Sequence, residues 1–194
     1  MQILIGTNNL HKLKNYKDAF RAYAPQTELL GLQDLNITED VEEDGDTLLE
    51  NAVKKVRFFG KKSGIITIAD DTGLFVDALG GEPGLHTKRW HEGSDHDRCV
   101  KLLERLKGKN RTAHYGWAVA VYNPTNKRDW SFEYELEGLI SDNFIDTGGF
   151  GYDEMFEVVS LGKHYSELSS QELLEFGGRG KGVKELIFNT NFLK

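Results

Sequence analysis

The chain has 194 residues, of which 39% are hydrophobic and 11% aromatic, a composition that suits one folded domain or one bilobal unit and excludes a disordered chain. The net charge is −7, but six acids lie within eight residues, and without them the chain would be close to neutral. Because it has no excess of basic residues, we expect neither nucleic acid nor a membrane as a partner. Cys99 is the single cysteine, which excludes an internal disulfide. The first residues lack a signal-peptide pattern, so the expected compartment is the cytoplasm.

Apolar periodicity predicts alternating strands and helices. A strand over residues 3–5 precedes a helix from Leu10 to Tyr23, and a helix that begins after Thr47 precedes a strand over 65–69. Further elements follow in order: a turn-rich stretch over 74–84, a helix capped by Asp95 or Asp97 that reaches Leu106, strands over 112–122 and 130–140 joined by a hairpin turn, a short helix opened by Ser169 and stopped at Gly177, and a helix over 181–192. We therefore predict an α/β fold with a mixed sheet.

The turn over residues 7–12, between the first strand and the first helix, is the first candidate site. Backbone N–H groups at a helix N-terminus form an anion site, and Lys12 adds a cation there. The glycine spacing of a phosphate-binding P-loop is missing. The alternative interpretation is a plain turn with an exposed lysine.

Asp70 and Asp71 come directly after the predicted strand over 65–69, and we place them at its carboxyl end. Two adjacent carboxylates there are costly unless they are used, and ligands of open α/β sheets bind at strand ends. They could hold magnesium or act as a base on water. A solvated turn or a helix cap is the alternative.

The acidic run is the third candidate. Its members are Glu39, Asp40, Glu42, Glu43, Asp44 and Asp46. Hard divalent ions prefer carboxylate oxygens, so the run predicts a metal site, whereas a solvated surface loop is the simpler interpretation. A capping box from Thr47 to Glu50 opens the helix that follows, and Asn51 and Lys55 lie four residues apart on it.

Histidines and aromatic residues give weaker indications. His86, His91 and His96 are near one another but lack the spacing of a zinc helix. Phe150 and Tyr152 stand in a second glycine cluster that includes Gly148 and Gly149. They are either core aromatics or a platform on which a planar base stacks.

Taken together and in this order, these segments resemble the Ham1 family of nucleoside triphosphate pyrophosphatases, also called inosine triphosphate pyrophosphatases. The matching segments are Thr-Asn-Asn-Leu-His-Lys at 7–12, Glu-Asp-Gly-Asp-Thr-Leu-Leu-Glu-Asn-Ala-Val-Lys-Lys at 43–55, Ala-Asp-Asp-Thr-Gly-Leu at 69–74, Val-Asp-Ala-Leu-Gly-Gly-Glu-Pro-Gly at 76–84 and Gly-Phe-Gly-Tyr-Asp at 149–153. The resemblance covers the chain from end to end.

The resemblance implies a single bilobal domain over residues 1–194, with an elongated mixed sheet, flanking helices and two lobes around a central cleft. It also implies a homodimer. The implied reaction is magnesium-dependent hydrolysis of non-standard purine nucleoside triphosphates, such as those of inosine and xanthosine, to the monophosphate and pyrophosphate.

The resemblance also implies roles for individual residues. Glu43 and Asp71 correspond to the magnesium ligands, and Asp71 to the carboxylate that activates water, with Asp70 assisting near the metal. The remaining correspondences are phosphate contacts at Thr7, Asn9, Lys12 and Lys55, a base-stacking ring at Phe150 with Tyr152 and Asp153 beside it, and a base contact at Arg179.

The chain departs from the family pattern mainly at the base-reading segment. The family's Ser-His-Arg is Gly177, Gly178 and Arg179 here, and a family lysine is Leu173. Fewer polar groups remain to read a base, so we expect relaxed or shifted base choice with the chemistry intact. Two rival functions stay open: a hydrolase of pyrimidine or modified nucleotides, and a nucleotide-binding protein without catalysis. In the turn over 7–12, Asn8 replaces a glycine, which matters if that position needs positive φ.

Overall fold

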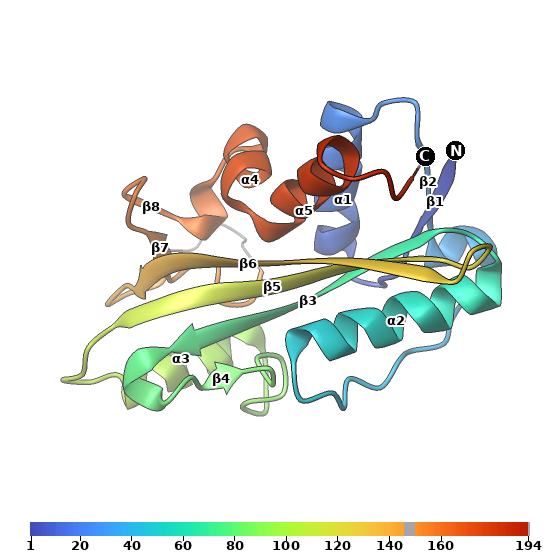
Figure 1. Ribbon diagram of the computed structural model, residues 1–194. Helices are drawn as coiled ribbons and strands as arrows, with labels where there is room; N and C mark the ends of the chain where they lie inside the picture. Colours follow the sequence, from blue (N-terminus) through green and yellow to red (C-terminus); the bar gives the residue numbers. More distant parts are fainter. Residues whose placement is uncertain (146–149, 194) are drawn as a thin grey trace. The chain divides into compact units, whose positions relative to one another are not determined.

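The computed structural model describes residues 1–145 and 150–193 (Figure 1). Gly148 and Gly149, which the sequence places in the second glycine cluster, lie outside the described residues. The chain divides into two compact units. The first comprises Met1–Asp71, Trp117–Tyr134 and Glu172–Lys194, and the second comprises Thr72–Gly116 and Glu135–Gln171. Within the described residues, no helix is long and apolar enough to cross a membrane.

The strands form one mixed sheet in the order β2-β1-β3-β5-β6-β7-β8, with β4 paired to β3. Their bounds are β1 (Gln2–Ile5), β2 (Glu28–Gly31), β3 (Thr67–Val76), β4 (Pro83–Gly84), β5 (Thr112–Asn123), β6 (Arg128–Ile140), β7 (Phe156–Val158) and β8 (Lys163–His164). β1 runs parallel to β2 and β3, whereas β4, β7 and β8 pair antiparallel with their neighbours. The predicted α/β fold with a mixed sheet is confirmed.

In the first unit, helices cover both faces of the sheet. Helix α2 (Leu48–Ser63) lies on one face, and helices α1 (Leu10–Tyr23) and α5 (Gly178–Phe188) lie on the other (Figure 1). A short 3-10 helix, η1 (Leu32–Leu35), follows β2.

Side chains alternate between these faces because successive residues of a strand point to opposite sides. Ile3 and Ile5 of β1 pack with α1 and α5, whereas Leu4 packs with Phe59 of α2. The same alternation holds in β3, where Ile68 joins the α1 and α5 side and Ala69 the α2 side.

The second unit is organised around helix α3 (Asp95–Arg105), with the short helices η2 (Asp77–Leu79) and η3 (Tyr165–Glu167). Two side chains of α3 hold Gly151, because Asp95 Oδ2 accepts from its backbone N–H at 3.0 Å and the Cys99 thiol donates to its carbonyl at 3.4 Å. Burial raises the pKa of that thiol to about 12. Gly151 has φ +64°, which glycine adopts freely.

Helix α4 (Ser170–Phe176) and α5 follow each other directly. The short helix ends before Gly177, as the predicted stop at Gly177 and Gly178 requires, but the predicted helix over 181–192 is wrong at both ends, since α5 ends at Phe188. It begins at Gly178, where a Cβ atom would lie 2.4 Å from the Trp117 ring. Glycine therefore lets the first turn of α5 lie against β5.

Three other local predictions need correction. Ser94, and not Asp95 or Asp97, caps α3, since its hydroxyl accepts from the Asp97 backbone at 3.2 Å. Strand β2 was not predicted, because its run of apolar residues is too short to show a period. Strand β3 does not end before the two aspartates but continues to Val76. Both carboxylates find partners beside the sheet, so the chain has no need to leave it to solvate them.

Candidate functional site

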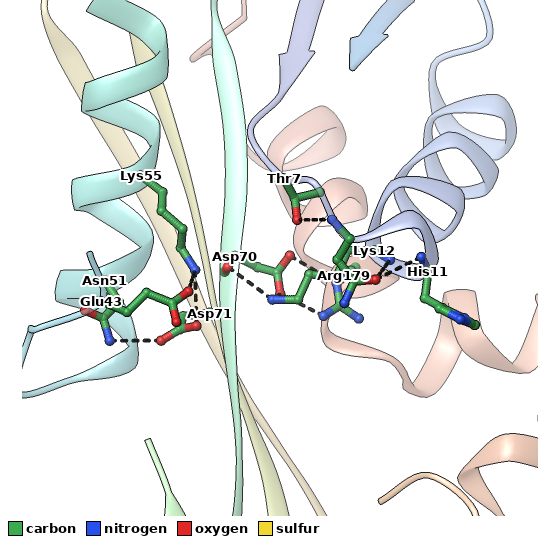
Figure 2. Close-up of polar contacts among 10 residues, drawn as sticks. Thr7, His11, Lys12, Glu43, Asn51, Lys55, Asp70, Asp71 and Arg179 are labelled. Atoms are coloured by element: carbon green, nitrogen blue, oxygen red, sulfur yellow. Dashed lines mark hydrogen bonds and ion pairs between the residues drawn. The ribbon is translucent and has the colours of Figure 1, made fainter. Parts of the chain in front are cut away.

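Asp70 and Asp71 lie in the middle of β3 and point to opposite faces of the sheet (Figure 2). The partners of Asp71 lie on α2, and one of them, Lys55, also binds Glu43 in the loop before that helix, whereas the partners of Asp70 lie on α1 and α5. The site therefore has two parts. We call them the Asp71 cluster (Glu43, Asn51, Lys55 and Asp71) and the Asp70 cluster (Lys12, Asp70 and Arg179).

In the Asp71 cluster, one ammonium group joins two carboxylates. Lys55 Nζ lies 3.1 Å from Asp71 Oδ1 and 2.8 Å from Glu43 Oε1. Burial opposes the charge of Lys55, but Asp71 and Glu43 outweigh it and raise the pKa of Lys55. Asn51 Nδ2 donates to the second oxygen of Asp71 at 3.0 Å. The Asp71 side chain is 9% exposed and that of Glu43 is 41% exposed, so the cluster opens to solvent on the Glu43 side.

Gly45 fixes the acidic loop against the start of α2. Its backbone N–H donates to Asn51 Oδ1 at 2.9 Å, so one amide side chain joins the loop to Asp71. A Cβ atom at residue 45 would lie 2.8 Å from Asn51 Oδ1, and therefore only glycine allows this approach. Half of the predicted capping box is present: the Thr47 hydroxyl accepts from the backbone of Glu50 at 3.1 Å. Glu50 itself accepts from the backbone of Asp46, one residue earlier than predicted.

Other acids of the run pair with lysines of α2. Glu39 lies 2.7 Å from Lys62, and Asp44 pairs with Lys54. All four side chains are exposed, and pairs of this kind add little to stability. Hydrogen bonds from these lysines lower the pKa of both acids. Glu43 is the acid of the run that shares a lysine with a residue of the sheet.

In the Asp70 cluster, one buried carboxylate holds two cations. Arg179 donates from Nε to Oδ1 at 3.1 Å and from Nη2 to Oδ2 at 2.8 Å, and Lys12 Nζ lies 2.9 Å from Oδ2. The Asp70 side chain has no exposed surface. Burial alone would raise the pKa of Asp70, but Arg179 and Lys12 together hold it well below its usual range. Burial lowers the pKa of Lys12.

The turn over 7–12 delivers Lys12 to this cluster. Asn9 caps α1, since its Oδ1 accepts from the backbone of His11 at 2.9 Å and of Lys12 at 3.3 Å. The Thr7 hydroxyl in turn accepts from the backbone of Asn9 at 3.1 Å. These hydrogen bonds engage backbone N–H groups that the predicted anion site would need for its ligand. Asn8 has no positive φ, so its replacement of a glycine needs no left-handed backbone.

The predicted base contacts on the second glycine cluster belong to the second unit. Phe150 is 38% exposed, whereas Tyr152 is 2% exposed and its hydroxyl has no hydrogen-bond partner among the described residues. Asp153 accepts from the hydroxyl of Tyr115 at 2.9 Å. The ring of Phe150 is thus more exposed than that of Tyr152, and the buried hydroxyl of Tyr152 is a polar group that a ligand could satisfy.

The donor set of Glu43 and Asp71 fits a magnesium ion. Magnesium takes oxygen ligands, binds through one or two carboxylates and keeps several waters. One oxygen of each residue lies within 3.1 Å of the same Lys55 Nζ, so both already point at one cation. Among the described residues, no group of three or more His, Cys, Asp and Glu side chains is arranged to hold a metal. His86, His91 and His96 therefore form no such group.

The first unit thus brings together the predicted residues Lys12, Asp70 and Arg179 in one cluster, and Glu43, Lys55 and Asp71 in the other. Sequence reasoning left two contacts out of the predicted site. Asn51 holds Asp71, and its spacing from Lys55 was the signal that could have found it. Tyr115 holds Asp153 from a strand 38 residues earlier, and no local pattern indicates this.

Comparison with known proteins finds one family profile and several relatives that match nearly the whole chain. The profile of the Ham1 family matches residues 3–188. The chain is 39% identical over 191 residues to the dITP/XTP pyrophosphatase of Thermoanaerobacter sp. (strain X514), a match that covers 96% of this chain and 94% of that protein. It is 37% identical over 198 residues to the dITP/XTP pyrophosphatase of Leptospira interrogans serogroup Icterohaemorrhagiae serovar copenhageni, covering 100% of this chain and 97% of that protein.

A solved structure agrees with these sequence matches. The Ham1 protein of Staphylococcus aureus superposes with a TM-score of 0.85 at 31% sequence identity, and the match covers 100% of both chains. The mixed sheet with flanking helices is therefore shared along the whole chain.

Proposed function

We propose that this protein, which belongs to the Ham1 family, is a hydrolase of non-standard purine nucleoside triphosphates such as ITP, dITP and XTP. Water attacks the α-phosphorus, the bond from that phosphorus to the bridging oxygen breaks, and pyrophosphate leaves with that oxygen. The products are the nucleoside monophosphate and pyrophosphate.

The observation that carries this proposal is the Asp71 carboxylate, oriented by two donors beside Glu43. Asn51 and Lys55 each bind one oxygen of Asp71, so the carboxylate has a fixed direction before substrate arrives. A carboxylate held in this way can take the proton of the attacking water. Lys55 lies within 3.1 Å of both carboxylates, which places a cation beside the metal position to contact a phosphate oxygen.

Glu43 and Asp71 are the proposed ligands of a magnesium ion, which when bound offsets the negative charge of the phosphate oxygens. Thr7, Asn9 and Lys12 are the proposed contacts to the rest of the phosphate chain. Of these, Lys12 supplies a cation, and the other two shape the turn that carries it.

Phe150, Tyr152, Asp153 and Arg179 remain the proposed base contacts. Gly177, Gly178 and Leu173 offer no polar side chains, so we propose that base choice is relaxed relative to a site with more hydrogen-bond donors. A hydrolase of pyrimidine or modified nucleotides is the second candidate, because it would use the same α-phosphate chemistry.

Pyrophosphate release from a panel of triphosphates tests the proposal. The panel contains ITP, dITP and XTP beside the standard purine and pyrimidine triphosphates, each with and without Mg²⁺. We expect magnesium-dependent release that is fastest with inosine and xanthosine nucleotides. Preference for ATP or a pyrimidine would overturn only the base assignment, whereas binding without any release would favour a nucleotide-binding protein.

We also propose a homodimer in the cytoplasm, where free nucleotides are found. Light scattering coupled to gel filtration measures the mass directly, and a mass of one 22.0 kDa chain would contradict the dimer.

A further inference from the structure

Asp70 and Asp71 are adjacent in the sequence, but in the structure their side chains have different partners on opposite faces of the sheet. Consecutive strand residues point to opposite faces, and the partners of the two residues confirm this (Figure 2). Asp71 faces α2, where Glu43 lies, and Asp70 faces α1 and α5. A carboxylate on the second face cannot share a metal ion with Glu43 across the backbone of β3.

The carboxylate of Asp70 is already engaged. Its two oxygens receive two N–H groups of Arg179 and the ammonium of Lys12, at 2.8 to 3.1 Å. The side chain has no exposed surface, and those of Arg179 and Lys12 are 11% and 17% exposed. Asp70 thus offers no open oxygen to water, whereas the two cations around it keep part of their surface.

The two cations come from segments far apart in the chain. Lys12 is on the first turn of α1 and is a proposed phosphate contact. Arg179 is on the first turn of α5 and is a proposed base contact. Oδ2 of Asp70 lies 2.9 Å from Lys12 Nζ and 2.8 Å from Arg179 Nη2. The two cations repel each other, and the carboxylate that both of them bind offsets this repulsion.

We propose that Asp70 is a positioning residue, which holds Lys12 and Arg179 at one fixed spacing and so sets the phosphate contact and the base contact together. It is neither a metal ligand nor the base. This inference rests on the proposed function for the roles of Lys12 and Arg179, but its test also includes measurements that need no turnover.

The test compares Asp70→Asn with Asp71→Asn, the same substitution on the opposite face of the strand. Mn²⁺ binding is measured by calorimetry without nucleotide, and tripolyphosphate binding is measured in the same way. We expect Asp70→Asn to keep Mn²⁺ affinity within about threefold of wild type and to weaken tripolyphosphate binding about tenfold. Asp71→Asn should weaken Mn²⁺ binding about tenfold or more.

Steady-state kinetics then separate positioning from a merely structural role. In Asp70→Asn the ratio of kcat/KM for ITP over that for GTP should fall about tenfold, because Arg179 no longer has a fixed place. Most of the change should lie in KM. Asp70→Glu keeps the counter-ion but moves it by one methylene, so the same shifts are expected in this second variant, which replaces Asp70→Asn if that variant does not fold.

Two results would overturn the inference. One is a loss of Mn²⁺ affinity in the Asp70 variants equal to that in Asp71→Asn. The other is tripolyphosphate affinity and an ITP to GTP ratio that both stay at wild-type values. If wild type releases pyrophosphate from no triphosphate, the proposed function fails, and the Mn²⁺ and tripolyphosphate measurements still decide the role of Asp70.

Discussion

The two faces of strand β3 carry the same kinds of groups in opposite proportions. The Asp71 cluster has two carboxylates and one ammonium, and one of its acids, Glu43, is 41% exposed. The Asp70 cluster has two cations and one carboxylate, and that carboxylate is completely buried. The first cluster therefore attracts a cation and the second an anion. Substrate phosphate and its metal ion need these two properties.

The difference in exposure between Glu43 and Asp70 decides whether an acid can give up a charged partner. An acid that reaches water can exchange Lys55 for a metal ion, since losing one partner leaves it solvated. A fully buried acid keeps its partners, because an unpaired buried charge is costly. We therefore propose a chemical role for the aspartate on one face and a positional role for the aspartate on the other.

The largest expected effect is on turnover at the Asp71 face. Asp71→Asn keeps the shape of the side chain and its contact with Lys55 but removes the proton acceptor. The kcat for pyrophosphate release should fall by about 10² to 10⁴. Asp18→Asn, at an exposed pair with Lys14, should leave kcat unchanged. An Asp71→Asn enzyme with near wild-type kcat would mean that another group activates the water.

The next effect is on stability, and here the Asp70 face should dominate. Arg179→Met removes one of the two cations that pair with the buried carboxylate and should lower the free energy of unfolding by about 3 kcal/mol. Lys55→Met should cost less, about 1 kcal/mol, because Glu43 reaches water and Asn51 still donates to Asp71. Urea denaturation measures both, with Arg57→Met at an exposed pair with Asp129 as the control. Equal losses at Arg179 and Lys55 would remove the contrast between the faces.

Two glycine variants should affect the faces separately. Gly178→Ala puts a methyl 2.4 Å from the Trp117 ring and should lower the free energy of unfolding by about 1 to 3 kcal/mol without changing metal affinity. Gly45→Ala pushes the acidic loop off Asn51 and should weaken Mn²⁺ binding about tenfold at a smaller cost in stability. Calorimetry and urea denaturation are applied to both. Weaker Mn²⁺ binding in Gly178→Ala would show that the faces are coupled.

The smallest effect concerns Lys55 as a competitor for the metal position. Its ammonium lies 2.8 Å from Glu43 and 3.1 Å from Asp71. Lys55→Met should therefore raise Mn²⁺ affinity in the absence of nucleotide, by about tenfold. Lys54→Met removes a neighbouring lysine that pairs with Asp44 instead, and should leave that affinity unchanged. Unaltered Mn²⁺ binding in Lys55→Met would argue against a metal position between the two acids.

Much of the fold could be predicted from local pattern. The helix from Leu10 to Tyr23 was predicted with both ends as observed, because apolar residues recur at helical spacing from Leu10 and Pro25 follows the helix. The two long strands were likewise predicted near their observed bounds. The error at β3 has a different origin. Paired aspartates indicate a turn only when no neighbour satisfies them, and their partners come from α1, α2 and α5.

The residue types of the candidate site were predicted, but their grouping was predicted only in part. Glu43, Lys55 and Asp71 meet as expected, since their motifs imply one site. Arg179 was predicted as a base contact, and its pairing with Asp70 across 109 residues has no local signal. The same is true of Trp117, whose ring fills the space that a side chain at residue 178 would need.

The sequence by itself determined the reaction class that we propose, through five spaced motifs. That β3 continues through Asp70 and Asp71, and so sends them to opposite faces, depends on partners from other segments of the chain. Only the tertiary structure decided what each face contains. Helices α1 and α5 surround Asp70 with cations and exclude water, whereas α2 and its acidic loop leave Glu43 open. Charge and burial around a carboxylate depend on which segments pack beside it, and those contacts link residues far apart in the chain.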